Sequence, residues 1–360
     1  MAVSTALNNI GNELLSTTMH IVMKEWRDNV HESTAFLDAA TRVHGQGNPT
    51  QAGGTRIVVP LGFGEHSKTT RMQTGYERID LSVEDVFQPA SYEWAHVVRP
   101  VAISSEEELI NQGDAAILSI LESRVKMTAN ALKREYVKQM VQGNQAGWED
   151  WNHLNGIDFD SASPTDGFSG GFLEAAATGT AAQTNTPGGV SKATFTAKTG
   201  WNNQFFNGSD SFNSNGLAGL YDLMVEINAV SPSGPPNVIL ASRSGFKNLK
   251  RALSASERYI DTDKLDGGRV SQTWDGVPID VEYNMPKITG KTSATTEASF
   301  YMLNMDDIYT LWDPKGYFDM GDFETVSGEY DVRAAKMRVR GQLIAKHLGS
   351  SGLAVNLDTF

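Results

Sequence analysis

The sequence SSEEELINQGDAAILSILESRVKMTANALKREYVKQMVQG, residues 104–143, carries the strongest structural signal in the chain. Its apolar side chains recur every three or four residues, a spacing that aligns them along one face of a helix. They are Leu118, Leu121, Val125, Ala129, Leu132, Tyr136 and Met140. Ser104 or Ser105 is suited to cap this helix, and three glutamates follow in its positive first turn. The pattern predicts one helix of about 57 Å that ends at Gly143, far longer than the average globular helix.

Residues 55–100, just before this helix, have patterns that are typical of β-strands. The segment 55–60 is rich in β-branched residues, and 76–83 and 92–99 alternate in polarity. We expect a long β-hairpin that needs a partner surface, because a two-stranded hairpin is only marginally stable in water. Farther upstream, residues 3–27 predict a thinly apolar amphipathic helix that lies as an arm on another surface.

The chain after the long helix divides into three parts. Residues 144–216 are mostly small and polar, and they predict an irregular excursion with short strands. Its tryptophans are expected to anchor it: Trp148, Trp151 and Trp201. Residues 217–313 alternate helical and strand patterns and predict a compact unit, whereas 323–348 predicts extended strands packed on the long helix. The predicted fold class is therefore α+β.

The composition excludes several classes of protein. Of the 360 residues 40% are hydrophobic, so the chain can bury a core. It has no cysteine, which excludes disulfides, thiolate zinc sites and cysteine nucleophiles. Its net charge of −13 is opposite to that of most free-standing nucleic-acid-binding proteins. No apolar run reaches about 18 residues, and the N-terminus lacks signal-peptide features. We expect a protein of a reducing cytoplasm, or of a particle assembled there, with no membrane partner.

Two short motifs resemble sites of chemistry, but their surroundings favour loops. GFSGG at 167–171 has the pattern of a hydrolase nucleophile elbow around Ser169, yet it follows a loop rather than a strand. Residues 261–267 begin like a calcium loop, but Gln272 stands where that loop needs a glutamate. We therefore expect no catalytic, cofactor-binding or metal-binding residues, and a structural protein that associates with itself. A serine hydrolase using Ser169 is the alternative from another class, and loss of an activity in Ser169→Ala would support it.

The order of these elements resembles that of tailed-phage major capsid proteins with the Hong-Kong-97-type fold. The segments that carry the resemblance, besides the long helix, are GTRIVVPLGFG at 54–64, GLYDLMVEINAV at 219–230, DGVPIDVEYNMP at 275–286 and YMLNMDDIYTLWDP at 301–314. The resemblance covers nearly all of the chain except 144–216, and it rests on the order of elements rather than on an invariant motif.

The resemblance implies a division of the chain into the parts of that fold. These are an N-terminal arm at 1–50, an extended β-hairpin loop at 51–102, the spine helix of a peripheral domain at 103–143, a variable insertion at 144–216, an axial domain at 217–318, and C-terminal strands of the peripheral domain at 319–360. Copies of the chain would form pentamers and hexamers that close into an icosahedral shell around double-stranded phage DNA.

The resemblance also implies partners and a location. The chain begins directly in the arm, without the charged helical segment that precedes it in some members, so a separate scaffolding protein is expected. A portal, in some members a decoration protein, and packaged DNA held by non-specific contacts would be the other partners. No cofactor is implied. The shell would assemble in the host bacterial cytoplasm and become the virion capsid. The alternative within this fold is an encapsulin, a cellular shell that packages enzymes. Copurifying cargo would favour that alternative, and packaged DNA would favour the phage.

Side chains of the hairpin loop and of the basic C-terminal run are the candidate contacts between subunits. They are Lys68, Arg71, Tyr76, Trp94, Arg333, Arg338 and Arg340. The basic run has a second interpretation, as a strand with a solvated face and salt bridges. Some relatives join a loop lysine to an asparagine of a neighbouring subunit by an isopeptide bond, and Lys68 and Asn356 are the candidates for such a bond here. The sequence places no carboxylate beside them, so we expect noncovalent cohesion instead.

Overall fold

The computed structural model describes most of the chain. The described residues are 35–44, 50–63, 71–72, 75–76, 78, 82, 86–110, 120–143, 145–156, 171–174, 183–194, 200–208, 212–255, 262–264, 270–286, 298–325, 331–357 and 360. They belong to two units. The smaller unit includes Pro100–Asn130 and Gly321–Lys336, and the larger comprises Glu32–Arg99, Ala131–Met320 and Met337–Phe360.

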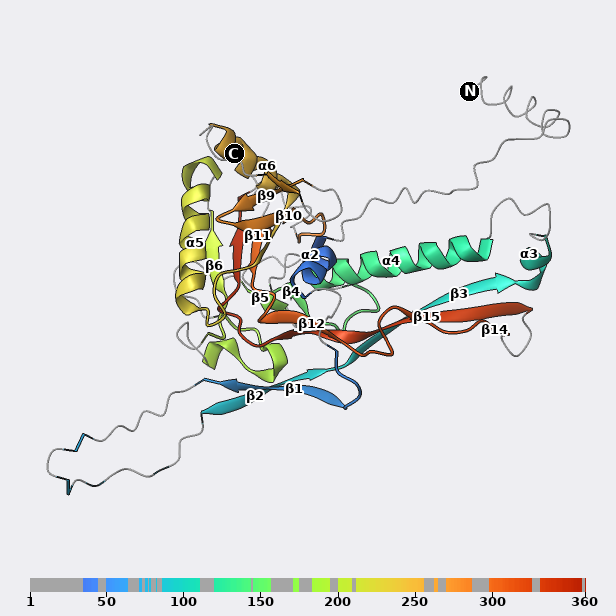
Figure 1. Ribbon diagram of the computed structural model, residues 1–360, viewed down its shortest axis with the longest axis horizontal. Helices are drawn as coiled ribbons and strands as arrows, with labels where there is room; N and C mark the ends of the chain where they lie inside the picture. The colour runs from blue at the N-terminus through green and yellow to red at the C-terminus, as the bar shows by residue number, and fades with distance from the viewer. Residues whose placement is uncertain are drawn as a thin grey trace. The chain divides into compact units, whose positions relative to one another are not determined.

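Helices and strands are mixed along the described chain, which confirms the α+β class (Figure 1). The helices are α2 (Ala35–His44), α3 (Ser105–Ile110), α4 (Ile120–Gln142), α5 (Leu217–Val230) and α6 (Arg243–Ala255), with short helical turns at η2 (Pro187–Gly189), η3 (Lys192–Thr194) and η5 (Phe212–Gly216). The strands are β1 (Arg56–Gly62), β2 (Phe87–Glu93), β3 (Ala95–Ser104), β4 (His153–Asn155), β5 (Gly171–Leu173), β6 (Gln204–Asn207), β7 (Val238–Ala241), β8 (Thr262–Lys264), β9 (Val270–Trp274), β10 (Val277–Val281), β11 (Ala298–Leu303), β12 (Ile308–Trp312), β13 (Asp319–Met320), β14 (Glu324–Thr325), β15 (Val332–Ala345) and β16 (Gly352–Val355). Among the described helices, none combines the length and the apolar character needed to cross a membrane.

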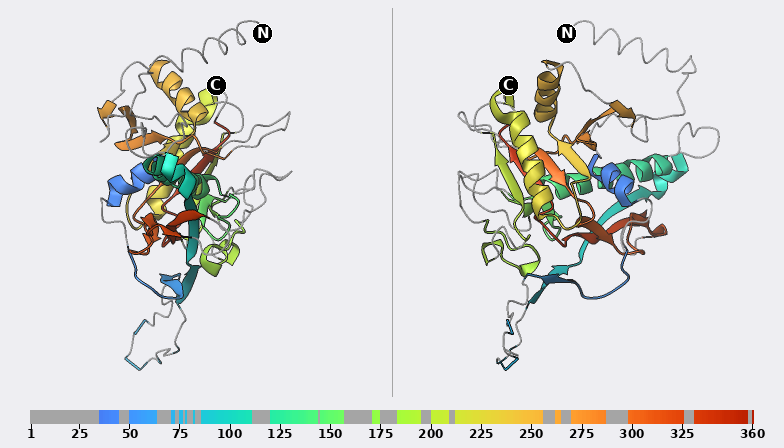
Figure 2. Two further views of the ribbon diagram at one scale, coloured as in Figure 1. Left: turned by 90° about the vertical axis from the view of Figure 1, so that its right-hand side faces the viewer. Right: turned by 60° about the vertical axis from the view of Figure 1, so that its left-hand side comes forward.

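A seven-stranded sheet, with the order β6-β16-β11-β7-β10-β9-β8, forms the centre of the larger unit. The pairs β16–β6 and β10–β7 are parallel, and the others are antiparallel. Helices α5 and α6 cover one face of this sheet, where Leu223, Leu249 and Phe300 join a buried apolar cluster (Figures 1 and 2). Ile279 of β10 faces that cluster, so its neighbour Asp280 faces the opposite side. There α2 packs, and Arg42 of α2 donates to Asp280 at 2.9 Å.

Two strands of this sheet come from segments that the sequence analysis assigned elsewhere. β6 lies within 144–216, so this segment supplies an edge strand of the central sheet as well as irregular chain. β16 lies within 319–360, yet it pairs with β6 and β11 rather than with the other C-terminal strands. A turn explains the second difference, because the Ser351 amide donates to the Leu348 carbonyl at 3.0 Å and redirects the chain. All four residues of β16 are buried, as is typical of a strand covered on both faces.

A second sheet is built around β15, which pairs with β3, β12, β13 and β14. The prediction of extended strands at 323–348 is confirmed by β14 and by the fourteen residues of β15. Side chains of β15 alternate between exposed and buried up to Val339 and are buried from Gly341 onward. β12 was expected in the compact unit at 217–313, and it pairs with β15 instead. Strands β3 and β15 and helix α4 each contribute residues to both units.

The predicted long helix is described in two parts, α3 and α4. Its continuity stays a prediction, because residues 111–119 lie outside the described residues. The cap is confirmed at Ser104, whose Oγ accepts from the Glu107 amide at 3.2 Å while Glu107 Oε2 accepts from the Ser104 amide. Arg124 donates to both oxygens of the Glu107 carboxylate, which lowers the pKa of Glu107 to about 2. The predicted end is also confirmed, because Gly143 takes a positive φ of 76° just after α4.

The apolar stripe of this helix is buried only near its C-terminal end. Leu132, Tyr136 and Met140 are buried, whereas Leu121 and Val125 are partly exposed. The apolar stripe therefore packs into a core of its own chain only in the last turns of α4. In the first turns of α4, the described residues of the chain leave Leu121 and Val125 of this stripe partly exposed.

An aromatic cluster in the larger unit holds the end of α4. The Tyr136 ring centre lies 5.0 Å from that of Trp312, 5.6 Å from that of Trp151 and 6.1 Å from that of Trp148. Trp148 and Trp151 thus anchor the start of 144–216, as predicted, and Trp201 is also buried. Aromatic rings packed in this way contribute both buried area and favourable ring geometry.

We predict that Tyr136→Ala lowers the free energy of unfolding of the subunit by about 3–5 kcal/mol, because it empties the centre of this cluster. Chemical denaturation of free subunits, followed by tryptophan fluorescence, measures the change. The control is Tyr76→Ala, since that side chain is 96% exposed, and it should change stability by less than about 0.5 kcal/mol. Equal losses in the two variants would contradict the role given to the cluster.

Candidate functional site

The β1–β2 ribbon is the clearest candidate for an interaction surface in the larger unit. β1 and β2 pair in antiparallel register from Arg56 opposite Glu93 to Gly62 opposite Phe87. This confirms that the two ends of the predicted hairpin pair, whereas most of its predicted strand at 76–83 lies outside the described residues. The inner face of the ribbon is buried and apolar. Its members are Ile57, Leu61, Ala90 and Tyr92. The question for this ribbon is therefore what covers each of its two faces.

The inner face is covered by the chain itself, which the sequence analysis did not anticipate. The Tyr92 ring packs edge-on against Phe172, with ring centres 6.3 Å apart, and the Tyr92 hydroxyl donates to the Ala345 carbonyl at 3.0 Å. The η2 turn lies close beneath the ribbon as well. A Cβ built on Gly188, which has a positive φ of 61°, would stand 2.9 Å from the Ala90 Cβ. Described residues of the segment 144–216 thus form a surface on which the inner face of the ribbon packs.

The apolar residues of the opposite face, which we name the outer ribbon face, are Val58, Pro60, Phe87 and Pro89, and Ser91 stands opposite Val58 on the same face. Val58 is 58% exposed and Phe87 is 71% exposed. Pro60 stands opposite Pro89, and Gly62 opposite Phe87, so the four apolar residues form one strip along the ribbon. An exposed apolar strip of this kind is a candidate surface for contact with another molecule. At its base Arg56 and Glu93 form an exposed ion pair of 2.8 Å.

Apolar side chains are exposed on two helices as well. Tyr221 and Val225 are one helical turn apart on α5, and both are more than half exposed. In the smaller unit, Leu109 of α3 and Met127 of α4 are also more than half exposed. These positions add to the outer ribbon face as apolar surface that the described chain leaves in solvent.

The sequence-predicted contact residues fall into two groups. Arg71 and Tyr76 are exposed, as an intermolecular contact requires, and Lys68 lies outside the described residues. Arg333 is exposed on β15, with its Cα opposite that of Thr325.

The other three contact residues already interact within the chain. Arg340 donates to Asp313 at 2.6 Å, and its guanidinium lies 5.0 Å from the centre of the Trp94 ring. Arg338 donates to Asp319 at 2.6 Å. These two arginines therefore form their salt bridges within the chain, and their predicted contacts between subunits stay a prediction.

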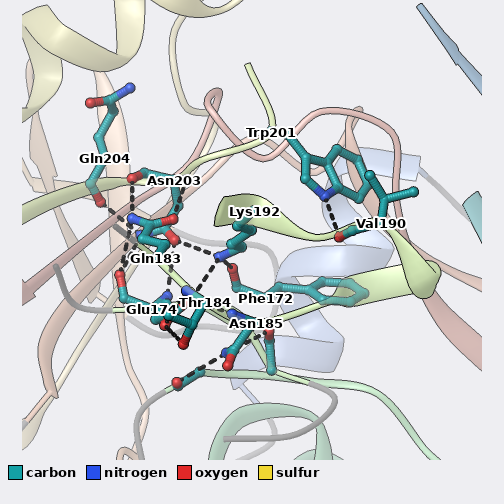
Figure 3. Close-up of polar contacts among 12 residues, drawn as sticks. Phe172, Glu174, Gln183, Thr184, Asn185, Val190, Lys192, Trp201, Asn203 and Gln204 are labelled. Carbon is teal, nitrogen blue, oxygen red and sulfur yellow. Dashed lines mark hydrogen bonds and ion pairs between the residues drawn. The ribbon is translucent and has the colours of Figure 1, made fainter. Parts of the chain in front are cut away.

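The segment 144–216 holds a buried lysine, Lys192, beside Phe172 and Asn203 (Figure 3). The Lys192 side chain is fully buried, and its Nζ donates to the Phe172 carbonyl at 2.6 Å and to Asn203 Oδ1 at 2.9 Å. The nearest carboxylate oxygen, Glu174 Oε2, is 4.0 Å from Nζ. Burial lowers the pKa of Lys192 to about 7, and the charge of Glu174 opposes part of this shift. We name Lys192, Glu174 and Asn203 the buried lysine cluster.

The cluster sits in a dense network of hydrogen bonds. The Glu174 carboxylate accepts from the amides of Thr184 and Asn185 at 2.8 and 3.0 Å. Asn203 donates through Nδ2 to the carbonyls of Glu174 and Gln204, and its Oδ1 accepts from the Glu174 amide. These bonds tie β5 to the chain that enters β6, and they replace an apolar core in this small segment.

Sequence reasoning missed this cluster and the composition of the outer ribbon face. A lone lysine in a Gly- and Ser-rich stretch is typical of solvated chain, so nothing in the sequence marks Lys192 as buried. The outer ribbon face had a weak signal, since Val58 and Pro60 share one strand face by alternation. The register that adds Phe87 and Pro89 to the same strip depends on the turn, and the pattern does not specify it.

The remaining candidates yield no chemistry within the described residues. Ser169 and Lys68 lie outside them. Asn356 follows β16, and its Nδ2 donates to Asn207 Oδ1 at 2.8 Å. A search of the described residues finds no group of His, Asp or Glu placed to hold a metal ion.

No family model matches the chain, and no curated protein matches its sequence. Solved structures match nearly its whole length. The capsid asymmetric unit of cyanophage A-1(L) aligns with a TM-score of 0.64 and 15% identity, covering 97% of this chain and 99% of that one. The capsid of an empty GTA particle aligns with a TM-score of 0.61 and 12% identity, over 96% and 98%. The holo-SrpI encapsulin complex of Synechococcus elongatus PCC 7942 aligns with a TM-score of 0.55 and 12% identity, over 97% and 95%.

These alignments cover both units of this chain and more than nine-tenths of each matched chain. The chain therefore has the fold that these shell-forming proteins share, the Hong-Kong-97-type fold, and the predicted fold is confirmed.

Proposed function

We propose that this chain is the major capsid protein of a tailed phage, and that copies of it assemble as pentamers and hexamers into an icosahedral shell around double-stranded DNA. The observation that carries the proposal is the outer ribbon face, an exposed apolar strip in a chain whose fold is shared with phage capsids. A protein that stayed monomeric would keep this strip in water, whereas a shell places each subunit against several neighbours. The occupant of the strip is therefore a second copy of the chain.

The proposal assigns the parts of the chain to roles in the shell. The hairpin loop at 51–102 reaches a neighbouring subunit, and its Arg71, Tyr76 and Lys68 contribute contacts there. The spine helix at 103–143 and the strands at 319–360 form the peripheral domain, except that β16 pairs with β11 of the axial domain. The N-terminal arm at 1–50 is a separate part. The axial domain at 217–318 meets its copies around the symmetry axes. The helix α2 at the end of the arm is docked on the axial sheet of its own chain.

The function proposed is structural, without enzymatic activity. DNA would be enclosed by non-specific contacts, in keeping with the net charge of −13. A scaffolding protein, a portal and, in some shells, a decoration protein complete the set of partners. Assembly takes place in the bacterial cytoplasm, and the shell becomes the virion capsid.

A second candidate, an encapsulin-type shell, is favoured by the likeness to the encapsulin complex. The contents of purified particles separate the two functions. Double-stranded DNA inside the shell supports the phage capsid, and a copurifying enzyme supports the encapsulin.

We predict that the chain, expressed with its scaffolding protein, forms closed shells visible by electron microscopy, and that Phe87→Asp abolishes them while the subunit stays folded. The reason is that an unpaired carboxylate buried between subunits is strongly destabilising. Sedimentation measures assembly, and circular dichroism measures folding. The matched control is Phe87→Leu, which keeps an apolar side chain and should still assemble. A well-folded wild-type monomer that never sediments as a large particle would overturn the proposal.

A further prediction concerns how the subunits of the shell are held together. The chain has no cysteine, and we expect noncovalent contacts rather than a Lys68–Asn356 bond. Shells boiled in detergent should release one band near the chain mass of 39.2 kDa. Their resistance to dissociation should fall as salt is added, because exposed charge pairs are screened over about 10 Å at 0.1 M salt. A ladder of covalent multimers would contradict this account.

A further inference from the structure

The buried lysine cluster brings an amine and a carboxamide together in a place closed to solvent. Lys192, Glu174 and Asn203 are all at least nine-tenths buried. Lys192 Nζ donates to Asn203 Oδ1 at 2.9 Å. Since an amide C=O bond is about 1.2 Å long, Nζ lies within about 4.1 Å of the carboxamide carbon, Cγ. That is close to the separation of about 3–3.5 Å at which reacting atoms are poised.

The orientation of the carboxamide is fixed by its neighbours. Oδ1 accepts from the Glu174 amide at 2.9 Å, and Nδ2 donates to the carbonyls of Glu174 and Gln204 at 2.9 and 3.0 Å. The reverse assignment would set a donor against a donor, so the oxygen is the atom beside Lys192. The Glu174 amide that donates to Oδ1 draws electrons from Cγ and would stabilise negative charge on Oδ1 while Nζ attacks Cγ.

The amine and the carboxylate have the properties that such an attack requires. Burial favours the neutral form of Lys192, whose pKa is lowered to about 7, and the neutral form carries the lone pair. Glu174 Oε2 lies 4.0 Å from Nζ, which is beyond hydrogen-bond distance, so it would have to move about 1 Å closer to take a proton from Nζ. The Thr184 and Asn185 amides hold this carboxylate in place. Nucleophile, electrophile and proton carrier therefore stand in one buried network (Figure 3).

We propose that Lys192 and Asn203 become joined within one chain by an isopeptide bond. The lone pair of Nζ attacks Cγ of Asn203, the bond from Cγ to Nδ2 breaks, and Nδ2 leaves as ammonia. Glu174 takes a proton from Nζ and passes it to the departing nitrogen. Amine and carboxamide thus give a secondary amide and ammonia, so the reaction is balanced without an oxidant or a further reactant.

The bond has a structural use in this fold. It would connect η3 to the chain that enters β6, next to Phe172, whose ring supports Tyr92 of the ribbon. A covalent link there would hold in place the surface on which the ribbon packs. The segment that forms this surface is small and has few apolar residues. It is separate from the contacts between subunits, because both partners belong to one chain, and it leaves the detergent band of the proposed function at the mass of a single chain.

The test is the mass of the purified full-length protein. We expect the intact mass to be about 17 Da below that of the sequence, which is the mass of ammonia lost on bond formation. In a tryptic digest, Lys192 should resist cleavage, and peptide 139–198 should appear joined to peptide 199–243. An intact mass equal to that of the sequence, with 139–192 and 199–243 recovered as separate peptides, would overturn the proposal. A loss of ammonia without joined peptides, as succinimide formation gives, would overturn it too.

Substitutions of single residues test which residue forms the bond and which residue carries the proton. Lys192→Arg removes the nucleophile and should restore the full mass of its own sequence. Glu174→Gln keeps the size of the side chain but removes the proton carrier, and it should leave most of the protein unlinked. The matched control is Lys336→Arg on the exposed side of β15, in which the loss of about 17 Da should persist. Complete linkage in Glu174→Gln would contradict the role given to the carboxylate.

Discussion

A two-stranded ribbon has two faces, and the described residues of this chain cover only one of them. The inner face of β1–β2 is packed on the segment 144–216 through Ala90, Tyr92 and Phe172. The outer ribbon face keeps Val58 and Phe87 in solvent. Backbone pairing does not remove these apolar side chains from water, so a molecule that covered the second face would stabilise the ribbon. In the proposed assembly, a second copy of the chain covers this face.

The segment 144–216 has a structural role, because it covers part of the inner face of the ribbon. This segment supplies β6 to the central sheet and two tryptophans to the cluster around Tyr136. It also forms a surface on which the ribbon packs. It has few large apolar residues, so part of its interior is polar, and the hydrogen bonds of Glu174, Asn203 and their neighbours hold it together. A buried network of this kind specifies one arrangement, because each unsatisfied group would be costly. The proposed isopeptide bond would make that arrangement permanent.

Local patterns made much of the fold predictable. The cap at Ser104, the end of the long helix at Gly143, the hairpin and the long C-terminal strand each have a signature a few residues long, and the structure confirms them. Pairings between distant segments had no such signature. Nothing near residues 352–355 indicates that β16 leaves the C-terminal strands to join β6 and β11. The burial of Lys192 likewise depends on a carbonyl of Phe172 and on Asn203, which approach it only after the chain has folded.

The central claim is that a neighbouring subunit covers the outer ribbon face. Since the chain has no cysteine, a single Val58→Cys substitution gives a clean probe, and its rate of maleimide labelling can be compared in free subunits and in assembled shells. The account predicts fast labelling of free subunits and protection by at least about tenfold in shells, as expected for a site buried in an interface. Equal labelling rates in the two states would contradict it.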